Sequence, residues 1–294
     1  QITFFKVVYR RHTNFAMEHV PQTINGANSL TTSEGSGTVT ISRNGDLVGR
    51  TYVQCATDAT DGIAGDQIVS SVEVEIGGQK IDKLTKEYNQ IMAELTTPES
   101  KAAAYKYLTG GQKNTLVASK SIVNGGTVQQ KHIIPLQFWF NRNPGLALPL
   151  IALQYHEVKL KLTWGKVSDC ARNDGTLATS PSGGLEVWCE YIYLDTDERR
   201  RFAQVSHEYL IEQVQIQSGA SSTSSITLNF NHPVKEIIWT DANATTTQKA
   251  RLTLNGQDRF AEQSREYFQI YQPLEHHTAV PGFNIKETER PQLL

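Results

Sequence analysis

The stretch from Asn143 to Trp164, NPGLALPLIALQYHEVKLKLTW, decides the fold class of this 294-residue chain. It begins with a turn at Asn143-Pro144-Gly145, because proline presets φ and glycine accepts a positive φ. From Gln154 onward apolar and polar residues alternate, and a period of two predicts a β-strand that buries one face. One predicted face carries His156, Val158, Leu160 and Leu162, and the other carries Tyr155, Glu157, Lys159 and Lys161.

Similar strand patterns recur before and after this stretch, separated by turn residues. Asn44-Gly45 predicts a hairpin between two of them, and Gly77-Gly78 predicts another tight turn. Many short strands joined by turns are typical of an antiparallel sandwich or barrel. We therefore expect an all-β chain, with strands near residues 2–9, 37–42, 47–54, 68–76, 131–140 and 185–194.

The segment from Ile81 to Leu108 departs from the strand pattern. Pro98 is suited to the first turn of a helix, and a run of alanines follows it. Such a segment is too short to bury a core of its own as a separate domain. We expect a helical insertion at about residues 81–108, in a long connection of the first β unit. Its first helix is indicated by apolar residues at helical spacing: Tyr88, Ile91, Met92 and Leu95.

A charge cluster from Asp195 to Arg201, in which three acids precede three arginines, interrupts the β pattern. It is typical of a solvated bridge between two units. A second run of strands is predicted after it, near residues 209–217, 226–230, 236–239 and 249–254. The remaining length is short for eight strands. We therefore expect a second β unit that is incomplete, or whose later sequence lies beyond Leu294.

Composition excludes several classes of protein. Hydrophobic residues make up 38% of the chain, which is enough for a core, yet no apolar run approaches the roughly 20 residues of a membrane helix. The net charge of −2 lacks the basic excess of a protein that wraps nucleic acid. We expect no direct, sequence-specific binding of nucleic acid.

No motif for a metal, a cofactor or catalysis is present, so we expect a protein that is not an enzyme. Cys55, Cys170 and Cys189 lack zinc-ligand spacing and predict free thiols in a reducing compartment, with a Cys170–Cys189 disulfide as the alternative. The eight histidines show no metal-binding spacing, and there is no GxSxG elbow. Glu73 and Glu75 could imitate a glycosidase pair, but the solvent row of an amphipathic strand is the preferred interpretation.

Four segments resemble one protein family and follow each other in that family's order. The stretch 143–164 closely resembles the matching segment of major capsid proteins from nucleocytoplasmic large DNA viruses, the iridovirus, chlorella-virus and mimivirus-like group. Gln1–Phe15 resembles the region after that family's N-terminal arm, Leu194–Ala203 resembles the link between its two barrels, and Leu254–Phe260 resembles part of its second barrel.

The resemblance implies a double jelly roll, which consists of two antiparallel β-sandwich barrels. The first would span residues 1–200 and the second residues 201–294. It further implies a structural subunit of an icosahedral capsid that forms homotrimeric, pseudo-hexagonal capsomers. Its partners would be itself, neighbouring capsomers and minor capsid proteins, with inner membrane or core proteins reached indirectly. The expected location is the virion, after assembly in the host cytoplasm.

Candidate contact residues lie at the start of the chain and at the link. Arg199, Arg200 and Arg201 would contact a neighbouring subunit or barrel, or else pair with Asp195, Asp197 and Glu198 of their own cluster. Asn243 begins an N-glycosylation sequon. The alternative functions are a jelly-roll module that binds a glycan or receptor, and a minor capsid protein of the same lineage. The contact candidates near the start are Phe4, Phe5, Tyr9, Arg10 and Arg11.

Overall fold

The structure is a computed structural model that describes residues 12–58, 63–110, 129–170, 182–218, 225–240 and 249–281. Its contacts divide the chain into two compact units. Unit 1 comprises Gln1–Thr85 and Leu108–Gln213, and unit 2 comprises Lys86–Tyr107 and Val214–Leu294. No described helix is long and apolar enough to cross a membrane.

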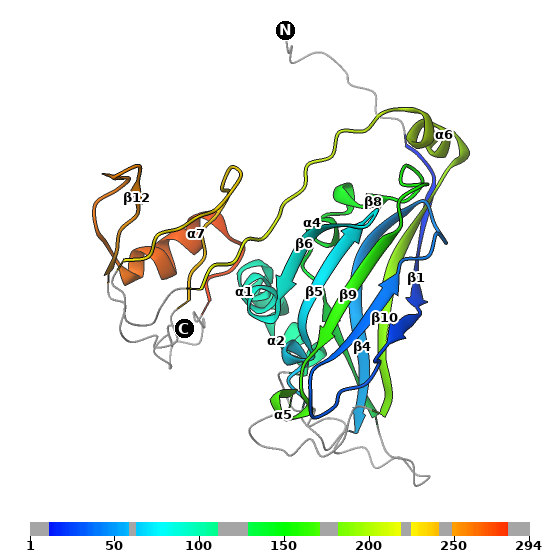
Figure 1. The fold of residues 1–294 in the computed structure, drawn as a ribbon, viewed down its shortest axis with the longest axis horizontal. Helices are drawn as coiled ribbons and strands as arrows, with labels where there is room; N and C mark the ends of the chain where they lie inside the picture. Colours follow the sequence, from blue (N-terminus) through cyan, green and yellow to red (C-terminus); the bar gives the residue numbers. More distant parts are fainter. Residues whose placement is uncertain are drawn as a thin grey trace. The chain divides into compact units, whose positions relative to one another are not determined.

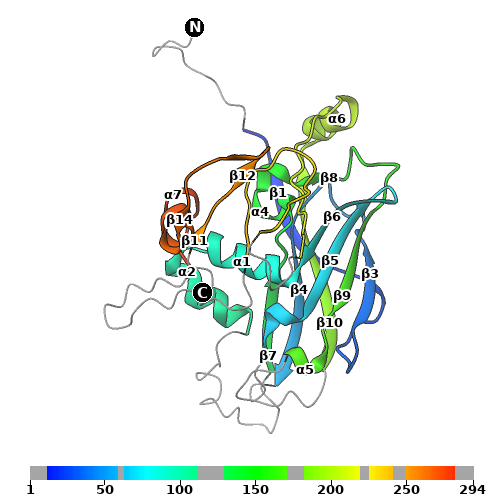
Figure 2. The same ribbon diagram turned by 60° about the vertical axis from the view of Figure 1, so that its left-hand side comes forward.

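Unit 1 contains two five-stranded sheets in which every pair of neighbouring strands is antiparallel (Figures 1 and 2). Sheet A has the order β1-β10-β4-β7, with β8 also paired to β4, and sheet B has the order β2-β3-β9-β5-β6. The strands of sheet A are β1 (Phe15–Gln22), β4 (Leu47–Asp58), β7 (Gln129–Pro135), β8 (Leu148–Pro149) and β10 (Ser182–Leu194). Those of sheet B are β2 (Ile24–Gly26), β3 (Gly35–Thr40), β5 (Val69–Ile76), β6 (Gln79–Thr85) and β9 (Val158–Trp164).

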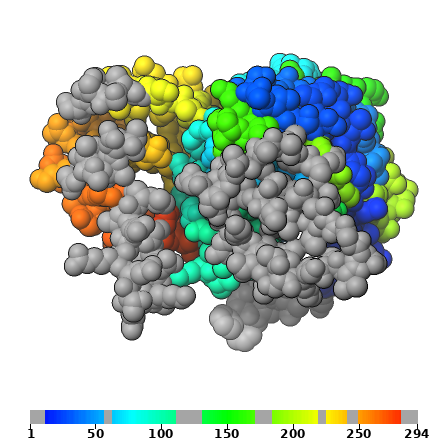
Figure 3. All heavy atoms as spheres, turned by 90° about the horizontal axis from the view of Figure 1, so that it is seen from below, coloured from blue at the N-terminus to red at the C-terminus, as the bar shows by residue number. Residues whose placement is uncertain are grey.

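The strands that pair are often distant in sequence. β1 pairs with β10, and β3 pairs with β9, so the first strands lie against late ones. In Figure 3, atoms from the start of the chain, in blue, accordingly lie beside green atoms from its middle. The mostly antiparallel architecture of unit 1 confirms that β-sheet dominates the fold, as predicted.

The core of unit 1 lies between the inner faces of the two sheets. In β9, residues Val158, Leu160, Leu162 and Trp164 are buried, while the residues between them are partly or fully exposed. The predicted alternation is therefore confirmed from Val158 onward. Residues 154–157 instead form a turn before the strand, and His156 is exposed. Sheet A contributes Val53, Cys55, Val187, Cys189 and Tyr191 to the same core.

The connection at Asn44-Gly45 is not the hairpin that the sequence predicts. β3 belongs to sheet B and β4 to sheet A, so the chain crosses from one sheet to the other here. The buried Tyr191 fixes this crossing, because its hydroxyl donates to the carbonyl oxygen of Ser42 at 2.5 Å. A Cβ at Gly45 would lie 2.9 Å from the Tyr191 Cβ, so a larger residue would collide with the ring. The predicted turn at Gly77-Gly78 does form the β5–β6 hairpin, with φ of 60° and 84°.

The strand predicted over residues 131–140 ends earlier, at Pro135. A short helix, α4 (Trp139–Arg142), follows it, so Trp139 lies outside the strand. The cause is the aromatic run Phe138-Trp139-Phe140, whose side chains are all buried and in mutual contact. Asn141 holds the turn in place by donating from Nδ2 to the carbonyl of Gly49 at 2.9 Å.

Short helices and turns complete unit 1. They are η1 (Gly65–Gln67), η2 (Pro144–Leu146), α5 (Val167–Cys170) and α6 (Thr196–Gln204). η2 contains the turn predicted at the start of the 143–164 stretch, and the Asn143 side chain accepts from the Gly145 N–H at 2.9 Å.

Unit 2 is mainly helical and irregular in its described part. Its helices are α1 (Lys86–Thr96), α2 (Glu99–Leu108), the π-helix η3 (Tyr267–Tyr271) and α7 (Gln272–His276). Two-residue strands form two small ladders, β11 (Lys249–Ala250) with β14 (Gln263–Ser264) and β12 (Thr253–Leu254) with β13 (Gln257–Asp258). α1 and α2 occupy the range predicted to be helical, between β6 and β7 in sequence, and most of their residues group with unit 2.

The strands predicted near residues 209–217, 226–230 and 236–239 are not formed among the described residues. Glutamine side chains connect residues 209–217 to residues 226–231 by hydrogen bonds to the backbone, in place of the backbone–backbone hydrogen bonds of paired strands. Gln217 donates from Nε2 to the Thr227 carbonyl and accepts from the Asn229 N–H, and Gln215 accepts from the Asn231 N–H. Trp239 therefore lies in a segment without regular secondary structure. Its ring packs against that of Phe268 in η3, with the ring centroids 5.0 Å apart.

The outward face of sheet B is charged. The Glu73 carboxylate lies 3.1 Å from the ammonium groups of both Lys80 and Lys83, and Glu75 pairs with Lys161 of β9. These glutamates are a solvent-side row, as predicted, and cross-strand lysines engage them. Burial raises the pKa of Glu73, but hydrogen bonds from Lys80 and Lys83 outweigh it and leave the pKa lowered.

We predict that Tyr191→Phe lowers the free energy of unfolding by about 1–2 kcal/mol, because the buried tyrosine loses its hydrogen bond to the carbonyl of Ser42. Tyr193→Phe is the matched control, since that hydroxyl hydrogen-bonds to Glu18 in a solvent-exposed contact two residues further along the same strand. Chemical denaturation of both variants measures the difference. Equal losses in the two variants would contradict the role given to Tyr191.

We predict that Glu73→Gln flattens the acid side of the stability profile. A carboxyl whose pKa is lowered by folding stabilises the protein above its unfolded pKa, and this contribution is lost as pH falls through the folded value. Melting temperatures between about pH 5 and pH 3 should therefore fall less steeply in the variant than in the wild type. Lys80→Met combined with Lys83→Met removes the cause and should flatten the profile in the same way. Parallel profiles for wild type and Glu73→Gln would refute this.

Candidate functional site

The residues predicted to contact another subunit fall into two groups. Phe4, Phe5, Tyr9, Arg10 and Arg11 lie outside the described residues, and so does Asn243. The arginines at positions 199–201 lie on α6, which directly follows β10.

α6 forms where the sequence indicated only a solvated bridge. The Asp195 side chain caps it by accepting from the Thr196 N–H at 2.8 Å. Asp197 and Glu198 occupy its first turn and Arg201 its last, an order that suits the helix dipole. This order of acids before arginines was the signal in the sequence that favoured a helix.

Asp46 connects α6 to the sandwich. Its side chain is 9% exposed, and Oδ1 lies 2.9 Å from Nε of Arg199. Oδ2 accepts from the Leu194 N–H at 2.7 Å, at the end of β10. The Arg199 guanidinium thus engages an acid that is far away in sequence. Spacing along the chain carries no signal for this pair. Arg200 and Arg201 are exposed.

The outward face of sheet A differs from that of sheet B, because it carries aromatic and apolar side chains. We call this surface the aromatic face and define it by Phe15, Met17 and His19 of β1, Trp188 of β10 and Tyr52 of β4. The strand register places all five on the same side of the sheet, opposite the buried Val53 and Cys189. Phe15 is 64% exposed and Met17 is 46% exposed, and β1 is an edge strand of its sheet.

The centre of the aromatic face is ordered by ring contacts and hydrogen bonds. The rings of Tyr52 and Trp188 are nearly parallel, with centroids 6.3 Å apart, and His19 contacts Tyr52 at 5.6 Å. Glu186 accepts from Nε1 of Trp188 at 2.9 Å, and Glu190 lies 3.8 Å from Nε2 of His19. The result is a preordered surface with two acids beside its rings. The prediction from sequence did not include it, although alternation in residues 15–19 was a signal that could have found it.

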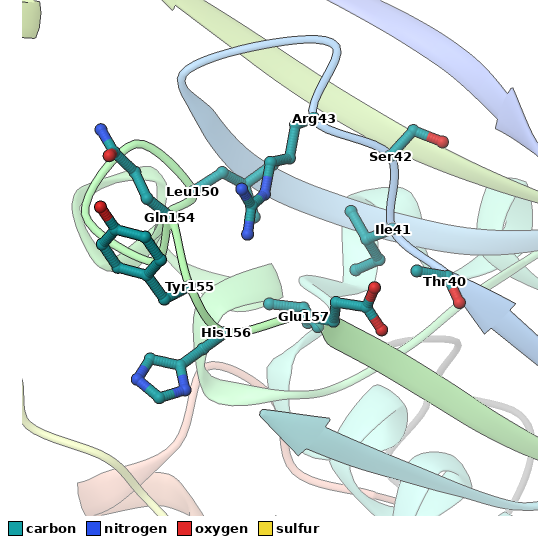
Figure 4. A pocket seen from close by; sticks show the side chains of 10 residues that line it. Thr40, Ile41, Ser42, Arg43, Leu150, Gln154, Tyr155, His156 and Glu157 are labelled. Carbon is teal, nitrogen blue, oxygen red and sulfur yellow. The ribbon is translucent and has the colours of Figure 1, made fainter. Parts of the chain in front are cut away.

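A shallow depression of about 440 Å³ lies at one end of the sandwich (Figure 4). It is bordered by Arg43 from the loop after β3, and by Gln154, Tyr155 and His156 from the turn before β9. Arg43 donates to the Leu153 carbonyl at 2.9 Å, and the neighbouring Glu157 pairs with Lys159 at 3.0 Å. Arg43 and Glu157 are thus engaged in structural contacts.

The cysteines are buried and free, so the alternative of a Cys170–Cys189 disulfide is wrong. Burial raises the pKa of the Cys55 and Cys189 thiols to about 12, which keeps them protonated and unreactive. The described residues contain no group of three or more His, Cys, Asp or Glu side chains that could hold a metal ion.

Comparisons with known proteins agree with one another. Residues 3–195 match the family described as major capsid protein N-terminus, and residues 198–251 match the one described as large eukaryotic DNA virus major capsid protein. The major capsid protein of Pyramimonas orientalis virus is 51% identical over 296 residues, covering 96% of this chain and 72% of the relative. That of Paramecium bursaria Chlorella virus 1 is 37% identical, covering 93% of this chain and 72% of the relative.

A solved structure supports the same assignment. The quasi-atomic model of the PBCV-1 virus capsid matches 95% of this chain and 78% of its own, with a TM-score of 0.69 and 34% sequence identity. The resemblance in the four sequence segments is thereby confirmed. The chain belongs to the family of major capsid proteins of large eukaryotic DNA viruses, and it is a structural component of the capsid.

Proposed function

We propose that this chain is one subunit of a homotrimeric, pseudo-hexagonal capsomer, and that such capsomers tile an icosahedral shell. The observation that carries the proposal is the match to a solved virus capsid over 95% of the chain. In this role the protein works through its surfaces and catalyses no reaction.

We assign the first jelly roll to residues 1–200 and the second to residues 201–294. The two five-stranded antiparallel sheets, with a chain that crosses between them at Asn44-Gly45, support the first barrel. Two barrels in each of three subunits give a tile with six corners, which suits a hexagonal lattice. Permanent contacts within such a tile resemble a divided protein core, whereas contacts between tiles gain strength through repetition.

Further parts of the proposal concern partners and place of assembly. Neighbouring capsomers and minor capsid proteins would contact the outer edges of the tile, and inner membrane or core proteins would be reached indirectly. Free, buried thiols suit assembly in a reducing compartment such as the host cytoplasm. Asn243 is kept as a candidate glycosylation site, and residues 4–11 as a candidate contact segment.

The role proposed for Arg199 is to position the link between the two barrels. Its contact with the largely buried Asp46 attaches α6 to the end of sheet A. Since Asp46 also accepts from the Leu194 N–H, the same carboxylate fixes the end of β10 and the helix that follows it. The direction in which the chain leaves the first barrel is then set by this carboxylate.

We predict that the expressed chain forms a stable species of three times the 32.8 kDa chain mass. Native mass spectrometry and sedimentation velocity at micromolar concentration measure it directly. A persistent monomer under these conditions would count against the capsomer proposal. A binding module for a glycan or receptor would instead be monomeric and would bind sugars on an array.

We predict that Arg199→Ala lowers the free energy of unfolding by about 1 kcal/mol, a modest loss because the guanidinium is 57% exposed. Arg199→Lys keeps the charge and should recover part of this loss. A double-mutant cycle isolates the contact, since Arg199→Ala should have almost no further effect in an Asp46→Asn background. Additive losses would show that the two side chains do not act together.

A further inference from the structure

The outward faces of sheets A and B differ in polarity, and contact with water alone does not explain the apolar side chains on sheet A. An antiparallel sheet that faces water on one side carries polar side chains there. Sheet B follows this rule, because its outward face carries threonines and the ion pairs of Glu73 and Glu75 with lysines. Sheet A breaks the rule, since the aromatic face exposes Phe15 and Met17 on the side of the sheet that also carries the rings of Tyr52 and Trp188.

We propose that the aromatic face is the surface through which one subunit binds a second copy of this chain. The inference rests on the proposed capsomer and names the surface that would hold it together. Exposed aromatic and methionine side chains are enriched in protein interfaces and depleted on solvated surfaces. The preordered contacts of Tyr52, Trp188 and His19 also reduce the entropy that would be lost on binding.

The charge of the face indicates what kind of contact it makes. Glu186 and Glu190 lie beside the rings, so two identical faces placed against each other would bring like charges together. A threefold ring instead requires two different surfaces on each subunit, because its contacts are heterologous. The counterpart on the second copy should therefore carry cations. Arg200 and Arg201 on α6 are exposed and have the required charge.

The chain provides its own probe for this inference, because it has two methionines, and each lies in a different environment. Met17 is 46% exposed on the aromatic face, whereas Met92 is 5% exposed in α1. Peroxide oxidises methionine at a rate that follows its access to solvent. Peptide mass spectrometry can follow both residues in the intact protein.

We expect Met17 in the wild-type trimer to oxidise at least about tenfold more slowly than in a free peptide of residues 12–22, as a side chain closed off in a native interface does. Met92 should be slow in every folded species. Phe15→Ser should raise the trimer's dissociation constant by about tenfold or more, and the resulting monomer should expose Met17. Tyr155→Ser is the matched control, because Tyr155 is 93% exposed and lies off the aromatic face, and it should leave the trimer intact.

The outcomes separate this inference from the proposal on which it rests. A wild-type trimer in which Met17 oxidises as fast as in the peptide would overturn the inference and leave the capsomer standing. Protection of Met17 that persists in the monomer would also overturn it, since the cover would then come from the same chain. Failure of the wild type to form any trimer would refute the proposed function itself.

Discussion

The packing of two sheets against each other is the constraint on which unit 1 depends. Each inner face is apolar at every second residue, as in Val158, Leu160 and Leu162 of β9. A slip of one residue would turn that set outward, so burial fixes the register of every strand pair. The crossing at Ser42 to Gly45 closes the sandwich, and it depends on the buried hydroxyl of Tyr191.

The same packing leaves two outward faces free to diverge. The outward face of sheet B carries Glu–Lys ion pairs, which are polar toward water and contribute little to the free energy of folding. Sheet A places aromatic side chains and the acids Glu186 and Glu190 on its face, around the ring contact of Tyr52 with Trp188. This asymmetry belongs to the fold, because inward-facing positions are fixed by burial while outward-facing ones are not. A rigid sandwich can therefore present a different surface on each side without a change in its core.

Sequence patterns predicted those parts of the fold that depend on local alternation. The strand at 158–164, the turn at Gly77-Gly78 and the helical range before β7 follow from periodicity and turn residues. Contacts between distant residues set the rest. Asn44-Gly45 has the composition of a hairpin, but the fit of Tyr191 against Gly45 sends the chain to the other sheet. Likewise Arg199 pairs with the distant Asp46, and no local pattern encodes that contact.

A chain that builds a shell needs surfaces that differ from each other more than it needs a reactive site. Closed rings of three require each subunit to offer two unlike surfaces, and a lattice of rings requires further ones. The aromatic face of sheet A and the exposed arginines of α6 would give each subunit two such unlike surfaces. Burial keeps the thiols of Cys55 and Cys189 protonated. The carboxylates of Glu73 and Glu75 form ion pairs with lysines of neighbouring strands. The contacts that stabilise the sandwich therefore engage these thiols and carboxylates, while Phe15 and Met17 of the aromatic face remain exposed.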